Sequence, residues 1–116
     1  MSDIKDVGQR NKLDELKKQE AEELAEMLSK KYNLPYIDLS VVSINTDALR
    51  LIPETDARAA GIAAFKIIAK KISVVIATPN NPKIAEILGH FKEQQYEVVE
   101  YMSSFASLER AWERYK

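Results

Sequence analysis

The chain has 116 residues but no cysteine, only one histidine and only three glycines. Without cysteine it has no disulfide, no cysteine-based zinc site and no thiol nucleophile. Because His90 is the single histidine, one copy cannot assemble a histidine zinc triad or a Ser-His-Asp constellation. We therefore interpret His90 as a surface or helix-end side chain, with a general base as the alternative.

The scarcity of glycine excludes the common phosphate-binding motifs. The glycines are Gly8, Gly61 and Gly89, which lie too far apart for a P-loop or a dinucleotide fingerprint. The densest acidic cluster comprises Glu20, Glu22, Glu23 and Glu26. Catalysis by paired carboxylates needs two acids that converge on a cleft, whereas these are expected on the solvated side of a helix. We predict no catalytic residue, no cofactor-binding residue and no metal ligand, and thus no enzyme.

Charge of one sign is not in excess either. The chain has 17 basic and 18 acidic residues and a formal net charge of −1. A nucleic-acid partner is not expected, because such binders gather a basic field that neutralises phosphates. No stretch approaches the roughly 18 apolar residues of a membrane span, so we predict no direct membrane insertion. The length suits one domain.

The N-terminal half begins with a helix that we expect over residues 12–32, after a flexible segment at 1–11. We predict a single α+β domain over 12–116. The expected apolar stripe of the helix comprises Ala21, Leu24, Ala25, Leu28 and Tyr32. Asn33 tolerates the left-handed conformation that ends a helix, and Pro35 cannot continue one. Residues 36–44 are rich in β-branched side chains and are predicted to form a strand or an extended strap.

The C-terminal half predicts alternating strands and helices. Short helical turns are expected at 47–52, behind Asn45 or Thr46, and at 54–60. The runs 62–68 and 72–77 predict a hairpin whose second strand is central, because it is apolar without alternation.

Two more helices and one more strand complete the pattern. Asn80 or Asn81 is expected to cap a helix that begins at Pro82; binding of an anion by the backbone N–H groups there is the alternative. A strand at 96–102 follows, and then a helix capped by Ser104, with Trp112 in the core rather than in a ligand site. The order is α-(β)-α-α-β-β-α-β-α around a mixed sheet of about three to four strands.

Two irregular motifs stand at a fixed separation. The first comprises Leu34, Pro35, Tyr36, Ile37, Asp38 and Leu39. The second comprises Ala48, Leu49, Arg50, Leu51, Ile52 and Pro53, followed by Ala57 and Gly61. With these motifs the chain resembles, over about residues 20–116, the N-terminal domain of the type II secretion and type IV pilus assembly ATPases (GspE/PilB-like).

The resemblance implies an accessory domain that docks a cytosolic ATPase onto the cytosolic domain of an inner-membrane platform protein. The other implied partner is the motor domain of the ATPase itself, and the implied location is cytoplasmic, peripheral to the inner membrane through partners. We interpret the motif residues as structural joints: Pro35 and Pro53 stiffen the chain, and Asp38 bonds local backbone. The chain stops inside a helical pattern at 113–116, so we expect an excised domain rather than a free-standing relative. The partner-binding residues are not assigned.

The alternative within the same family is a domain that senses a cyclic dinucleotide. Some relatives bind this ligand through an RLG-x-x-L … GLI … Q pattern that precedes the first motif. Here Val7, Gly8, Gln9 and Arg10 do not form RLG, and Lys31 stands in place of the glutamine. These departures favour the protein-interaction domain.

Overall fold

The structure is a computed structural model that describes residues 2–115, with side chains from Leu16 onward. Its elements are α1 (Ser2–Lys31), η1 (Leu39–Val41), α2 (Thr46–Leu49), α3 (Glu54–Ala60), β1 (Ile62–Ile68), β2 (Lys71–Ile76), α4 (Pro82–Glu93), β3 (Glu97–Met102), α5 (Phe105–Trp112) and η2 (Glu113–Tyr115). The described part contains one mixed sheet in the order β1-β2-β3, with β1 antiparallel and β3 parallel to β2. The predicted α+β class is confirmed.

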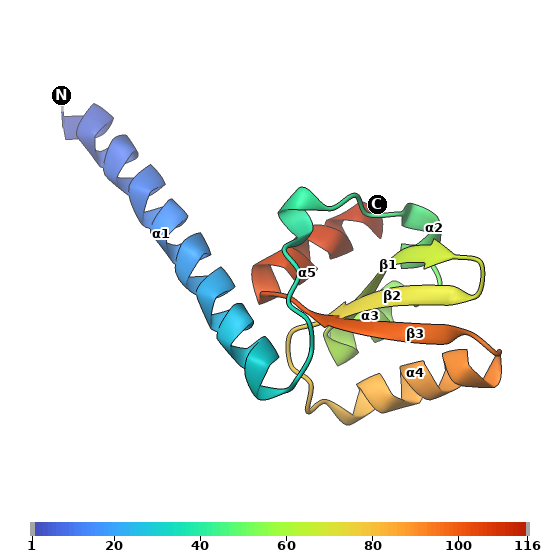
Figure 1. The fold of residues 1–116 in the computed structure, drawn as a ribbon. Helices are drawn as coiled ribbons and strands as arrows, with labels where there is room; N and C mark the ends of the chain where they lie inside the picture. Colours follow the sequence, from blue (N-terminus) through green and yellow to red (C-terminus); the bar gives the residue numbers. More distant parts are fainter. Residues whose placement is uncertain (1, 116) are drawn as a thin grey trace.

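β2 is the central strand, as predicted. Its side chains from Ile72 to Ile76 are all buried, although successive side chains of a strand point to opposite faces. Both faces of the sheet are therefore covered at β2. The helices that cover them surround the sheet in Figure 1.

The hairpin between β1 and β2 has a tight turn. Ile68 pairs with Lys71, so Ala69 and Lys70 make the turn, and Ala69 has a φ of 54°. This left-handed conformation costs an L-residue roughly 1–2 kcal/mol. The turn thus closes at a position where glycine has the lower conformational cost.

α1 projects away from the rest of the fold and meets it only toward its C-terminal end (Figure 1). The predicted start at Lys12 was wrong, because the helix begins at Ser2; the flexibility of residues 1–11 stays a prediction. The end was correct, since Asn33 has a φ of 58°. Within the predicted apolar stripe Ala25 is buried, but Leu24 is 56% exposed.

The segment 36–44 forms neither a full strand nor a fully extended strap. Tyr36 makes one parallel bridge to Met102, and a 3-10 turn follows at η1. The Met102 N–H donates to the Pro35 carbonyl at 2.8 Å, and the Ile37 N–H donates to the Met102 carbonyl at 2.9 Å. Pairing does not extend toward the N-terminus because Pro35 has no N–H to donate. The observed connection differs in extent from the predicted one: residues 32–38 join α1 to η1 along the end of β3. We call these residues, 32–38, the strap from here on.

The predicted caps are present. The Asn81 Oδ1 atom accepts from the Lys83 N–H at 3.0 Å, and the Ser104 Oγ atom accepts from the Ser107 N–H at 3.1 Å. Trp112 is buried, and its Nε1–H donates to the Ile62 carbonyl at 3.0 Å. The two caps fix where α4 and α5 begin, and the bond from Trp112 holds α5 against the start of β1.

Glu22 corrects the expectation of a fully solvated acidic cluster. Its carboxylate accepts from the Tyr36 hydroxyl and from the Ser104 hydroxyl, so it joins α1 to the strap and to the start of α5. Burial, together with the hydrogen bond to Glu22, raises the pKa of Tyr36 well above its usual value. The phenol therefore stays a donor through the neutral range. Glu20, Glu23 and Glu26 are exposed as predicted.

The turn residue offers a first test. Ala69→Gly removes the left-handed strain and should raise the free energy of unfolding by about 0.5–1 kcal/mol. The matched control is Ala85→Gly on the exposed side of α4, which should lower it by about 1 kcal/mol. Urea unfolding followed by circular dichroism measures both. Equal losses for the two variants would contradict the strained turn.

The Glu22 contacts offer a second test. Glu22→Ala removes two hydrogen bonds to a charged acceptor and should lower the free energy of unfolding by about 1–2 kcal/mol. Hydrogen exchange should speed up in residues 22–31 more than in β2, because the contact holds α1 and not the sheet. Glu26→Ala, whose exposed side chain makes no such bond among the described residues, is the control. The role assigned to Glu22 fails if the two variants behave alike.

Candidate docking groove

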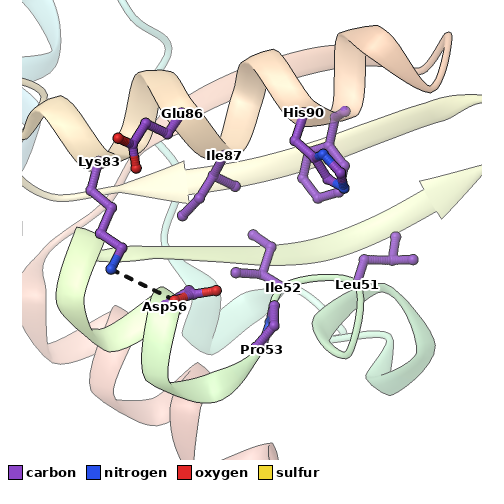
Figure 2. Close-up of a pocket in the computed structure, with 9 residues that line it drawn as sticks. Leu51, Ile52, Pro53, Asp56, Lys83, Glu86, Ile87 and His90 are labelled. Carbon is purple, nitrogen blue, oxygen red and sulfur yellow. Dashed lines mark ion pairs between the residues drawn. The ribbon is translucent and has the colours of Figure 1, made fainter.

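A groove of about 340 Å³ runs between α3 and α4 (Figure 2). α4 forms one wall, and α3 with the connection from α2 to α3 forms the other. The lining residues are Leu51, Ile52, Pro53, Asp56, Lys83, Glu86, Ile87, His90 and Phe91. We call this surface the α3/α4 groove.

The floor of the groove is apolar. Ile52 and Phe91 are 1% and 3% exposed, so they belong to the core and show only an edge to the groove. Leu51 and Ile87 are half-buried, and Pro53 is exposed. An apolar side chain placed here would cover carbon surface that now faces water, which is favourable at about 25 cal/mol per Å².

The rim of the groove is charged. The Lys83 Nζ atom lies 3.6 Å from the Asp56 Oδ1 atom, so an ion pair links α4 to α3 across one end (Figure 2). Both side chains are more than two-fifths exposed, and such a pair is worth about 0–1 kcal/mol. Glu86 and His90 are exposed further along α4. Breaking this ion pair, and so opening this end of the groove, therefore costs little.

The wall that contains Ile52 is held from behind. The Tyr115 hydroxyl donates to the Ile52 carbonyl at 2.8 Å. Burial, with the negative charge of Glu54 nearby, raises the pKa of Tyr115 to about 12. Pro53 comes next and has a φ of −56°, and α3 begins directly after it. Residues 51–53 thus have a defined position at the mouth of the groove.

The second sequence motif supplies part of this surface. Leu49 is fully buried in the core, while Leu51, Ile52 and Pro53 line the groove. Our interpretation of the motif as a structural joint stays a prediction, since the same residues also form a surface. The exposed position of His90 agrees with the surface assignment.

The first motif lies elsewhere, on the strap and η1. Leu39 is buried, and Leu34 and Tyr36 are half-buried. Asp38 Oδ1 accepts from the Ser40 N–H at 2.9 Å and caps η1. The Pro35 carbonyl accepts a hydrogen bond from the Met102 N–H, as described above. None of these residues lines the α3/α4 groove.

Sequence reasoning missed several lining residues, among them Asp56, Lys83, Glu86 and Ile87. Ile87 has the i, i+3, i+4, i+7 spacing that is typical of the core face of a helix, although it is only half-buried. One signal was present: Ile84, Ile87, Leu88 and Phe91 form an arc in which Ile87 stands at one edge. The charged residues carried no signal, because nothing local shows that α3 and α4 are neighbours.

Among residues 16–115, whose side chains the structure describes, there is no group of three or more His, Asp or Glu side chains that could hold a metal ion. Residues 2–115 include no helix long and apolar enough to cross a membrane. What the groove offers is an apolar floor with a charged rim.

The family comparison matches most of the chain. A model described as the MshEN domain matches residues 32–116. That range includes both sequence motifs, all three strands and every residue of the α3/α4 groove. Among curated protein sequences, no significant match was found.

Solved structures share the fold. The structure of MshE with cdg has a TM-score of 0.64 and 22% identity, and the match covers 80% of this chain and 66% of that one. The N-terminal domain of XpsE has a TM-score of 0.63 and 10% identity, over 97% of this chain and 93% of that one. Another crystal form of the N-terminal domain of XpsE has a TM-score of 0.58 and 11% identity, and the match covers 78% of this chain and 63% of that one. At these identities the likeness shows the fold alone.

Tyr115 provides a test of how the groove wall is held. Its pKa is higher in the folded state, about 12, than the usual value of 10. Its stabilising effect is therefore complete below about pH 10 and is lost as the pH rises through about 12. Tyr115→Phe should lower the free energy of unfolding by about 1 kcal/mol at pH 7. The difference in stability between wild type and this variant should narrow above about pH 10.

Urea unfolding at pH 7 and at pH 11 measures this change. Tyr101→Phe is the control, because the half-buried Tyr101 hydroxyl has no hydrogen bond among the described residues. A gap between wild type and Tyr115→Phe that does not depend on pH would contradict the assignment.

Proposed function

Because the chain belongs to the MshEN domain family, the N-terminal domains of GspE/MshE-type ATPases of type II secretion and type IV pilus assembly, we propose that it docks the cytosolic motor onto an inner-membrane platform protein. Its contact is the cytosolic domain of that protein. The second partner is the motor domain of the ATPase itself, and the location is cytoplasmic, peripheral to the membrane through partners.

The α3/α4 groove is the observation that supports this proposal. Its volume of about 340 Å³ is at the lower end of the range for small-molecule pockets, about 300–1,000 Å³. A surface of this size suits one apolar anchor of a protein partner, surrounded by weaker polar contacts. Leu51, Ile52 and Ile87 would contact the anchor, and the Asp56–Lys83 pair would lie at the rim.

The rigidity of the groove suits a coupling role. Ile52 and Phe91 belong to the core, and the Ile52 carbonyl is bonded to Tyr115. A load applied by a partner in the groove would pass directly to the sheet and not to a loose loop. A domain that links a motor to a fixed platform needs such a connection.

The sequence alternative, a cyclic-dinucleotide sensor, stays a prediction. The likeness to MshE with cdg is at 22% identity and carries the fold only. The side chains of Val7, Gly8, Gln9 and Arg10 lie outside the described residues, and Lys31 is exposed near the end of α1. No feature of the α3/α4 groove favours a dinucleotide.

The proposal predicts that one substitution in the groove weakens docking. Ile87→Asp places a carboxylate on the apolar wall, whereas Ala85→Asp places the same group on the exposed side of the same helix. In titration calorimetry with the cytosolic domain of the matching platform protein, Ile87→Asp should weaken binding at least about tenfold, or about 1.4 kcal/mol. Ala85→Asp should stay within about twofold of wild type.

Two outcomes would overturn this proposal. One is the absence of any binding by the wild-type chain at about 100 µM, a concentration that detects interactions as weak as about 5.5 kcal/mol. The other is equal binding by Ile87→Asp and wild type. Thermal unfolding of both variants would show whether Ile87→Asp remains folded, so that lost binding is not mistaken for lost structure.

A further inference from the structure

The free side of α1 has an apolar stripe that no part of the described chain covers. Leu16, Leu24 and Met27 are 54%, 56% and 68% exposed. At about 100° per residue, the three side chains lie within an arc of about 80° on the helix surface. Ala25 and Ser29, which are buried against the fold, lie on the opposite side. α1 therefore has two contact faces, of which one is unused.

Charges flank the pair Leu24 and Met27 in a definite order. Glu20 and Glu23 lie within one turn before Leu24, and Lys30 and Lys31 lie within one turn after Met27. All four are exposed. The acidic side chains and the basic side chains thus stand on either side of Leu24 and Met27, the two most exposed apolar side chains of the stripe.

This order is self-complementary in one orientation only. When two such helices lie antiparallel about the midpoint of Leu24 and Met27, each Leu24 faces the other Met27. Glu20 then lies opposite Lys31, because one is four residues before Leu24 and the other four after Met27. A parallel pair would instead place acid against acid and base against base, which is unfavourable.

We propose that α1 pairs with α1 of a second copy of this chain as an antiparallel, two-fold symmetric helix pair. Closed two-fold contacts of this kind use the same patch on both copies. The helix projects from the fold (Figure 1), so a second helix can reach the stripe. The pairing goes beyond docking in the α3/α4 groove, since α1 contributes no residue to that groove.

The contact is small. Stable interfaces bury about 1,200–2,000 Å², and Leu24 and Met27, the two apolar side chains that each helix brings to the contact, fall short of that area. The pairing is therefore weak for the domain alone. It becomes effective when several copies are held together, because a second contact within an assembly forms at a high effective concentration.

Cysteine cross-linking tests the orientation, since the natural chain has no cysteine. In the antiparallel pair the two Met27 positions are offset by about 4.5 Å along the axis and the two Leu16 positions by about 28 Å, at 1.5 Å per residue. Under mild oxidation Met27→Cys should give a disulfide-linked dimer, and Leu16→Cys should not. Cross-linking of both variants, or of neither, would overturn the proposal.

A charge swap tests the partner. In sedimentation of the full chain, Glu20→Lys with Glu23→Lys should weaken self-association at least about tenfold, and the addition of Lys30→Glu with Lys31→Glu should restore it to within about threefold. All four side chains are exposed, so circular dichroism should show unchanged folding. Ile87→Asp is the control that leaves the pairing intact. A wild-type chain that stays monomeric at about 1 mM, or a swap that does not restore association, would overturn it.

Discussion

The burial of β2 on both faces and along both edges is the constraint on which the rest of the structure depends. Its side chains from Ile72 to Ile76 are shielded, so helices must lie on both sides of the sheet. A parallel neighbour requires a crossover, and α4 supplies it between β2 and β3. α3 ends directly before β1, so the position of β1 in the sheet also places α3 against the core. The α3/α4 groove lies on the surface between these two neighbouring helices, α3 and α4.

The two proposed contact surfaces differ in how they are held. The groove is formed by core side chains, with Ile52 fixed through Tyr115. α1 is attached near its C-terminal end, through Ala25, Ser29 and the bonds of Glu22. The first surface suits transmission of force to the sheet, and the second suits a contact that forms and breaks. Because the two surfaces are separate, the proposed contact with a platform protein and the proposed contact with another copy do not exclude each other.

Much of the fold could be predicted because its signals are local. The hairpin followed from two β-branched runs, and the starts of α4 and α5 followed from Asn81 and Ser104. The unalternated run in β2 indicated a central strand. The extent of α1 was not predictable, because the charged residues before Lys12 are compatible with either a helix or a flexible segment. The single bridge at Tyr36 depends on Met102, which lies far along the chain.

For the candidate site, the contribution of the sequence and that of the tertiary structure can be separated more clearly. The sequence by itself determined the order and type of the elements, the absence of thiol and histidine-triad chemistry, and the two motifs that indicated the family. These depend on residue identity and on spacing within a few turns. Only the tertiary structure decided that Leu24 faces water while Glu22 is bonded, and that Ile52 and Ile87 face each other across a groove. Whether a side chain is covered depends on neighbours that only folding brings together.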